Sequence, residues 1–362
     1  MFGLFSGKNS SLGINIGTTN VKIVELRKEN NIPVLLNYAI SYNQGLVLQS
    51  SNLEILDGQT KKILQEVLRK GKFKARRAVV GIPTFFALVS FVEIPEMPTS
   101  EVEKAVRFEA AKLVPSPIDE VSFGWEIIGS YQEKSIEGSQ PTRGVRKMEV
   151  MVVTVPNSVV KKLSSEVSSL RLNVAAMEVE NFAVARSLVG NDKGTFLIID
   201  IGDNTTSFTV TSGGVVRVTR SIDIGGMKIS RALAGSLGVD LQRAEQIKKS
   251  NQINLLNPKD RFSSLITPIV GMIAEEAKRL QEAFYRRNPL KKIDKVILTG
   301  GTSRLATLEE YFSQQLSLEC RKGDPLARIG VKREHREVAE EVAPELTVAI
   351  GLALRGLEGL AK

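Results

Sequence analysis

Two copies of one short pattern, separated by half the chain, constrain the fold more than any other feature of this sequence. The first copy is LGINIGTTNVKIVEL at residues 12–26, and the second is FLIIDIGDNTTSFTV at residues 196–210. Ile14–Gly17 and Ile199–Gly202 superimpose at an offset of 185 residues in a chain of 362. In each copy apolar residues alternate with small or polar ones around a glycine turn, which predicts strand, tight turn and strand. A hairpin duplicated at this spacing predicts two lobes of related architecture.

The composition argues against several other kinds of protein. Cys320 is the single cysteine, which allows no intramolecular disulfide and no cysteine metal site. His335 is the single histidine, so we expect neither a Ser-His-Asp triad nor a His-rich metal site, and its charged surroundings, KREHRE, predict an exposed side chain. No apolar run approaches the roughly 20 residues that cross a bilayer, and the first residues turn polar too soon for a signal peptide. We therefore expect a cytoplasmic protein.

The chain has a net charge of +9, and basic clusters occur at residues 69–77 and 286–292. Only Phe73 could stack on a base within the first of them, so we do not expect nucleic-acid binding. The clusters are typical of solvated helix ends, and attraction to an anionic membrane surface is the second interpretation.

The rest of the chain shows alternating helical and extended patterns. We expect helices at about 58–70, 100–113, 158–170, 226–233, 241–249, 264–287, 304–316 and 345–357, and strands at 78–82, 85–94, 148–155, 174–179 and 295–298. Ser100 should cap its helix, with Glu103 at the capping-box position. The polar stretch 130–147 predicts a long exposed hairpin loop.

Three glycine turns each follow a short apolar strand, at Gly17, Gly202 and Gly300-Gly301. Glycine has no Cβ, so the backbone N–H groups of such turns can approach a phosphate closely. One such turn is commonly an ordinary hairpin. Three in this order, two of them copies, favour a nucleotide-binding cleft between two lobes.

These motifs resemble those of the actin, Hsp70 and sugar-kinase superfamily. INIGTTNVK is similar to its first phosphate motif, IDIGDNTTS to its second and VILTGGTSRLATL to its adenosine motif. MEVENFAVARSL and PELTVAIGLALRGL resemble the two helices that connect the lobes. The stretch from VVGIPTFF to PSPIDEVSF resembles the small subdomain of the FtsA-like branch. Within that branch, FEAAKLVPSPIDEV and the closing PELTVAIGLALRGL are similar to the PilM family of type IV pilus assembly proteins.

The resemblance implies an α/β fold of the actin-like, two-lobe, ATP-binding kind. Such a fold consists of duplicated ribonuclease-H-like cores, here with an FtsA-type small subdomain in the first lobe. We expect residues 1–82 to form the first lobe, completed by 175–190 and 340–362. Residues 83–174 should form the small subdomain, and 191–339 the second lobe with the adenosine-binding loop.

The resemblance also implies which residues bind ATP or ADP. They come from the two phosphate hairpins, the turn at Gly225, one helix and the adenosine loop: Asn15, Gly17, Thr18, Thr19, Lys22, Gly202, Asp203, Asn204, Thr205, Gly225, Gly226, Glu245, Lys248, Gly300, Gly301 and Arg304. Glu245 and Lys248 would hold ribose and adenine, and Arg304 would lie against the adenine plane. From the residues alone, Glu245 and Lys248 would be interpreted as an ordinary surface ion pair.

Two acids carry the expected catalytic chemistry. Asp200 is expected beside a hydrated Mg²⁺, which it would hold through water. Glu180 could position an attacking water, or could be a charged residue at a helix start. Asn15 stands where the superfamily usually has Asp, and Met227 where a polar residue is commoner. The loss of a carboxylate near a hard cation favours nucleotide binding with weak or no ATPase activity.

The resemblance implies partners as well. Proteins of this family are cytoplasmic and peripheral to the inner membrane through a protein partner, and they capture the N-terminal cytoplasmic peptide of PilN alongside other pilus assembly proteins. Self-association stays open. The alternative is an FtsA-like cell-division filament protein, which normally continues into an amphipathic membrane helix, whereas this chain stops at Lys362. A small-metabolite kinase is the third interpretation, and Asn15 argues against it.

Overall fold

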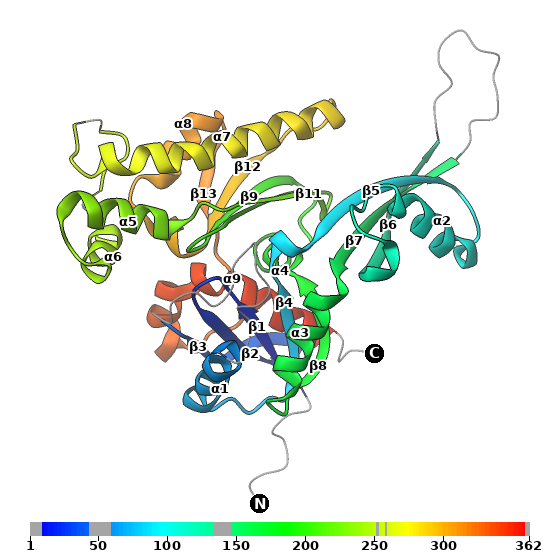
Figure 1. The fold of residues 1–362 in the computed structure, drawn as a ribbon, viewed down its shortest axis with the longest axis horizontal. Helices are drawn as coiled ribbons and strands as arrows, with labels where there is room; N and C mark the ends of the chain where they lie inside the picture. The colour runs from blue at the N-terminus through cyan, green and yellow to red at the C-terminus, as the bar shows by residue number, and fades with distance from the viewer. Residues whose placement is uncertain (1–8, 43–58, 133–145, 251–252, 258, 359–362) are drawn as a thin grey trace, which may run out of the picture. The chain divides into compact units, whose positions relative to one another are not determined.

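The computed structural model describes residues 9–42, 59–132, 146–250, 253–257 and 259–358, which divide into two compact units (Figure 1). One unit comprises Met1–Thr84 with Leu163–Lys362, and the other comprises Phe85–Lys162. The first unit holds two five-stranded sheets and the second a three-stranded sheet.

The two five-stranded sheets have the same topology. The first runs in the order β3 (Ile32–Ile40), β2 (Val21–Glu29), β1 (Ser10–Ile16), β4 (Arg77–Ile82) and β8 (Asn173–Val179). The second runs in the order β11 (Val215–Ile222), β10 (Thr206–Ser212), β9 (Thr195–Ile201), β12 (Lys295–Thr299) and β13 (Cys320–Lys322). In both, the first three strands pair antiparallel and the last two join in parallel. The duplication predicted from the hairpins therefore extends over whole sheets.

The repeat holds at the level of single hydrogen bonds. The Gly17 N–H donates to the Asn20 carbonyl at 2.9 Å, and the Gly202 N–H donates to the Thr205 carbonyl at 3.0 Å. These two turns are 185 residues apart in sequence, the offset at which the motifs superimpose. The strand ends repeat too, since Asn15 pairs with Lys22 and Asp200 pairs with Ser207.

Helices cover the second sheet with a continuous apolar core. They are α5 (Gly226–Leu237), α6 (Leu241–Lys249), α7 (Ser263–Arg287) and α8 (Leu308–Leu316). Phe208 of β10, Phe284 of α7 and Phe312 of α8 are completely buried in this core. Burying each such ring contributes about 1.5–3 kcal/mol, which fixes the sheet that carries the second hairpin. The first sheet packs against α1 (Gln59–Gly71) and α9 (Arg336–Glu358).

The two predicted connecting helices, α4 (Glu180–Leu188) and α9, pack against each other. They share one buried cluster with residues of both sheets, namely Val79, Ala183, Val184, Val189, Phe196, Ile198, Val348 and Leu352. The helices approach so closely that a Cβ built on Gly351 of α9 would lie 1.9 Å from the Ala183 carbonyl oxygen. Asn181, buried at the start of α4, donates to the Phe208 carbonyl at 3.3 Å and accepts from the Thr84 hydroxyl. The helices thus connect the two sheets as the motifs predicted.

The second unit is a small α/β layer. Its sheet runs in the order β5 (Leu88–Pro95), β7 (Arg146–Pro156) and β6 (Val121–Gln132), with all neighbours antiparallel. Helix α2 (Thr99–Ala111) buries Val102, Val106 and Ala110 against the sheet. Helix α3 (Asn157–Ser168) follows β7.

Several expected element ends are wrong, each for a local reason. Ser100 does not cap α2, because the helix begins at Thr99 behind Pro98, which has the fixed φ of a proline and makes no side-chain cap. The strand expected from residue 85 begins at Leu88, since Thr84–Phe86 forms a 3₁₀ turn after Pro83. The stretch 130–147 is strand at both of its ends, in β6 and β7, and its middle lies outside the described residues.

Two expected helix starts near the predicted site are also wrong. Residues 301–304 form a 3₁₀ turn, and α8 begins only at Leu308. The last helix begins at Arg336 instead of 345 and continues through Pro344. Strands β3, β6, β11 and β13, each at an edge of its sheet, were not expected. Among the described residues, no helix combines the length and hydrophobicity that crossing a membrane requires.

Candidate functional site

Both hairpins, the loop at Gly300 and one turn of α9 line a single cleft in the first unit. The cleft encloses about 630 Å³ of space, a volume that includes its open mouth. The residues that line it are Asn15, Gly17, Thr18, Asn20, Lys22, Glu180, Asp200, Gly202, Asp203, Thr205, Ser207, Gly300, Gly301, Pro344, Glu345 and Val348. Eleven of these sixteen were expected from the sequence, so residues up to 286 positions apart do come together.

Five lining residues were missed: Asn20, Ser207, Pro344, Glu345 and Val348. The repeat could have found two of them. At the offset of 185, Asn20 corresponds to Thr205 and Ser207 to Lys22, and both counterparts were expected. The other three lie on α9, where nothing in the sequence shows which helix face meets the cleft.

Two partly buried carboxylates, Glu180 and Asp200, line the cleft. Burial raises the pKa of Glu180 to about 7, and the Asp200 charge adds to the rise, while Lys22 and hydrogen bonds from Thr84 and Asn15 oppose it. Burial likewise raises the pKa of Asp200 to about 6, opposed by Lys22. These acids therefore carry unfavourable negative charge near neutral pH, which a bound cation would relieve.

Asn15 has a structural reason for being an amide. Its Nδ2 donates to Glu180 Oε1 at 2.6 Å. An aspartate at this position would place a third carboxylate against an acid that burial already disfavours in its charged form. The departure from the superfamily pattern thus fits the environment that Glu180 creates.

The raised pKa values predict how the stability of the nucleotide-free protein depends on pH. The folded-state pKa values of about 7 and 6 lie above the ordinary 4.5 and 3.8, so folding favours the protonated acids. That stability is complete below about pH 4 and is lost as pH rises through 6 to 7. We expect thermal stability to fall by about 1–3 kcal/mol between pH 5 and 8 for Glu180 alone.

Glu180→Gln should flatten this pH dependence in a thermal-melt series, whereas Glu310→Gln, at an exposed glutamate on α8, should leave it unchanged. If thermal stability fell equally with pH in the parent and in Glu180→Gln, the pH dependence would not come from Glu180.

The loop after β12 is built around Gly300. Its φ of 84° is accessible mainly to glycine, and a Cβ there would lie 2.5 Å from both Asp200 Oδ1 and the Ile201 carbonyl oxygen. The Gly300 N–H donates to the Pro344 carbonyl at 3.1 Å, which ties the loop to α9. Gly301 is different, because its Cβ would meet only the Glu345 side chain, at 3.4 Å or more.

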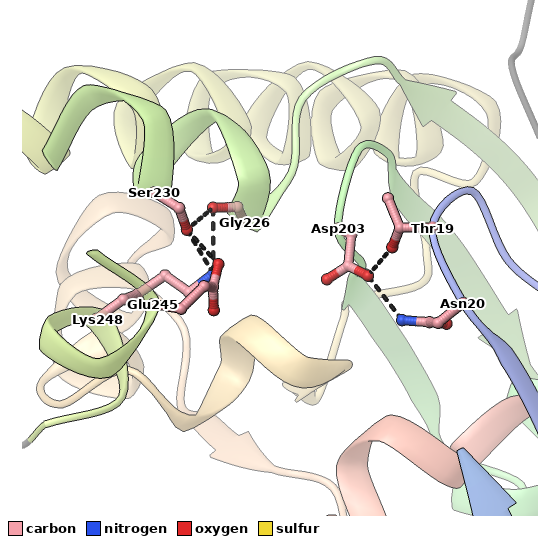
Figure 2. A network of polar contacts seen from close by, with 7 residues as sticks. All are labelled: Thr19, Asn20, Asp203, Gly226, Ser230, Glu245 and Lys248. Carbon is pink, nitrogen blue, oxygen red and sulfur yellow. Dashed lines mark hydrogen bonds and ion pairs between the residues drawn. The ribbon is translucent and has the colours of Figure 1, made fainter. Parts of the chain in front are cut away.

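Gly226 joins the second hairpin to a polar cluster on α5 and α6 (Figure 2). Its N–H donates to the Gly202 carbonyl at 2.9 Å, and its carbonyl accepts from Lys248 Nζ at 3.2 Å. Lys248, only 8% exposed, also contacts Glu245 at 2.6 Å and Ser230 at 2.9 Å. The expected pair of Glu245 and Lys248 is therefore a half-buried network and not an exposed surface pair.

The remaining expected residues lie around the cleft without lining it. A Cβ on Gly225 would meet the Asp203 and Gly202 carbonyl oxygens at 2.5 and 2.6 Å, so the turn packs on the second hairpin. Asn204 lies within that hairpin's turn. Arg304 is 32% exposed and pairs with Glu341 at 3.3 Å and Glu345 at 3.9 Å. Thr19 donates its hydroxyl to Asp203 of the second hairpin.

Comparison with known proteins identifies the family. The model of the type IV pilus assembly protein PilM family matches residues 13–357. The solved PilM-PilN type IV pilus biogenesis complex superimposes with a TM-score of 0.80 at 25% identity, covering 96% of this chain and 98% of that one. MreB 5 of Spiroplasma citri, bound to AMPPNP, shares the fold with a TM-score of 0.51 at 13% identity, covering 95% of this chain and 94% of that one.

Relatives among cell-division proteins are more distant. FtsA of Agrobacterium fabrum is 26% identical over 241 residues, which cover 55% of this chain and 54% of that protein. The chain thus spans about half the length of the FtsA proteins it matches first. These matches and the duplicated sheets confirm the actin-like, two-lobe α/β fold of the FtsA-like branch. The match over nearly the whole sequence shows that this chain belongs to the type IV pilus assembly protein PilM family.

Proposed function

We propose that this chain binds Mg·ATP in the cleft and, within the type IV pilus assembly machinery, captures the N-terminal cytoplasmic peptide of PilN. The observation that carries the nucleotide part is the convergence of two copies of one glycine hairpin and the Gly300 loop around two partly buried acids. A protein of the same fold, MreB 5, has been solved with AMPPNP bound.

The phosphates would bind between the hairpins. Gly17 and Gly202 line the cleft at the same point of the same turn, and Lys22 adds a positive charge beside them. The adenosine would lie towards Gly301, the Gly226 turn and the cluster of Glu245 and Lys248. Gly226 supports this placement, since its Cβ position lies 2.3 Å from the Thr302 hydroxyl in the Gly300 loop.

The acids in the cleft suit a hydrated magnesium ion. Asp200 and Glu180 supply hard oxygen donors, and their raised pKa values mark negative charge that lacks full compensation. The ion would neutralise phosphate charge when bound. Because Asn15 replaces a third acid, we expect turnover far below the roughly 1–100 s⁻¹ of dedicated phosphoryl-transfer enzymes.

The partner assignment is supported by family membership and by the 0.80 TM-score to the PilM-PilN complex. PilN capture would keep the protein peripheral to the inner membrane through its partner. An extended peptide of this kind binds by backbone pairing and side-chain pockets.

We expect nucleotide and peptide binding to be coupled. Linkage is reciprocal, so Mg·ATP changes peptide affinity by the same factor by which the peptide changes Mg·ATP affinity, typically about 5–150-fold. Asp200→Ala should weaken Mg·ATP binding and abolish the coupling, yet leave the peptide affinity measured without nucleotide intact.

The test is titration of a labelled PilN N-terminal peptide into the parent and the variant, each with and without Mg·ATP, with a scrambled peptide as the control. Failure of the parent to bind the peptide would contradict the partner assignment. Equal parent affinities in both conditions would contradict the coupling alone.

A further inference from the structure

One carboxylate joins the two phosphate hairpins. Asn20 Nδ2 of the first hairpin donates to Asp203 Oδ2 of the second at 2.7 Å, and the Thr19 hydroxyl donates to the same oxygen (Figure 2). The partners are 183 and 184 residues apart in sequence, so this contact connects the hairpins of the two sheets.

The carboxylate lies where a phosphate oxygen would use the same donors. Asn20 and Asp203 both line the cleft, together with Gly17, Gly202 and Lys22. In the part of the chain that the structure describes, no lysine or arginine forms an ion pair with Asp203. Its carboxylate accepts from a hydroxyl and an amide of the first hairpin, and both of these groups can also donate to a phosphate oxygen.

The hairpin does not need an acid at this position. At the offset of 185, Asp203 corresponds to Thr18, and both hairpins close with the same bond between backbone groups, at 2.9 and 3.0 Å. Neither residue has a positive φ. The Asp203 carbonyl accepts from the Met227 N–H at 2.7 Å, a bond that does not depend on the side chain. The carboxylate is therefore an addition to the turn and not a requirement of it.

We propose that Asp203 is a specificity-determining residue: its carboxylate occupies the Thr19 and Asn20 donors, and a nucleotide phosphate binds between the hairpins by displacing it. This inference rests on the proposed nucleotide function. It follows that Asp203 opposes ligands that carry phosphate, through competition for donors and through like charge, and has no such effect on adenosine. It also follows that Asp203 holds the hairpins together without nucleotide.

Hydrogen exchange of the nucleotide-free protein tests the hairpin contact independently of ligand binding. Asp203→Thr copies the first hairpin, so the turn should form normally. We expect faster amide exchange at residues 17–20 and 202–205 in Asp203→Thr and in Asn20→Ala than in the parent, with unchanged exchange in the β9 core. Unchanged exchange at both hairpins would overturn the proposal.

Equilibrium binding of Mg·ATP and of adenosine tests displacement. Asp203→Thr should bind Mg·ATP about 5–150-fold more tightly than the parent and adenosine equally well. Asn20→Ala, which breaks the same contact but removes a donor, should show no gain. Weaker Mg·ATP binding by Asp203→Thr would overturn the proposal and make Asp203 a ligand of the nucleotide or its metal.

The binding results distinguish failure of the role proposed for Asp203 from failure of the proposed nucleotide function. Absence of Mg·ATP binding in the parent and in both variants would contradict the proposed function and displacement together. Tighter binding confined to Asp203→Thr supports both. Binding of equal strength in the parent and Asp203→Thr leaves the proposed function standing and overturns the role of Asp203.

Discussion

Gly351→Ala should destabilise the folded protein by about 3 kcal/mol, the upper end of the usual cost of overpacking a core. The added methyl group would lie 1.9 Å from the Ala183 carbonyl oxygen and 2.5 Å from its carbon, so α9 and α4 would have to separate. Helix α9 cannot shift away easily, because its other contact is equally close: a Cβ on Gly13 of β1 would lie 1.9 Å from the Ala349 carbonyl oxygen. Since both helices connect the two sheets, their separation should disrupt the cleft as well.

Chemical denaturation measures this effect, and Gly235→Ala provides the matched control. Gly235 also lies within a helix, α5, but a Cβ there meets nothing within 4 Å. It should gain about 0.5–1 kcal/mol from the better helix propensity of alanine. Stability of Gly351→Ala equal to that of the parent would mean that the two helices are not packed as described.

Gly300→Ala should reduce Mg·ATP affinity by about 5–150-fold, the equivalent of 1–3 kcal/mol of backbone strain. The variant must abandon the φ of 84° or push against Asp200 Oδ1 and the Ile201 carbonyl oxygen, each 2.5 Å from the new Cβ. Either change moves the adenosine loop relative to the acid expected beside the metal.

Gly238→Ala is the control for backbone strain at a glycine that lies outside the cleft. Gly238 has a φ of +65° at the end of α5, and a Cβ there meets nothing within 4 Å. Both variants should lose stability, but only Gly300→Ala should lose nucleotide affinity in a fluorescent-ATP titration. If Gly300→Ala bound nucleotide as tightly as the parent, the Gly300 loop would not be part of the nucleotide site.

Much of the fold was predictable because its strongest signal is local and repeated. Alternation around Gly17 and Gly202 depends only on neighbouring residues, and helix α6 begins and ends where its pattern predicted, behind Asp240, whose side chain accepts from the Arg243 N–H. Element ends set by tertiary contacts were harder to predict. The 3₁₀ turn at 301–304 and the stretch of α9 around Pro344 are joined by the hydrogen bond from the Gly300 N–H to the Pro344 carbonyl. No local sequence pattern reveals this contact.

The candidate site divides in the same way. Residues within the repeated hairpins could be placed from sequence. Asn20 and Ser207 were overlooked, although their counterparts at the offset of 185 were both expected in the site. Glu345 and Val348 could not, since the face of α9 that meets the cleft depends on packing against α4 and β1. The contact of Asp203 with Asn20 joins residues 183 positions apart, and the sequence indicates only that both lie in turns.

Photolabelling with 8-azido-ATP, mapped by mass spectrometry, locates the bound nucleotide on the chain. We expect labelled peptides that contain residues 245–248 or 300–304, with labelling removed by excess Mg·ATP and strongly reduced in Gly300→Ala. Labelling confined to other parts of the chain, or labelling that excess Mg·ATP does not remove, would contradict the assignment of this cleft as the nucleotide site.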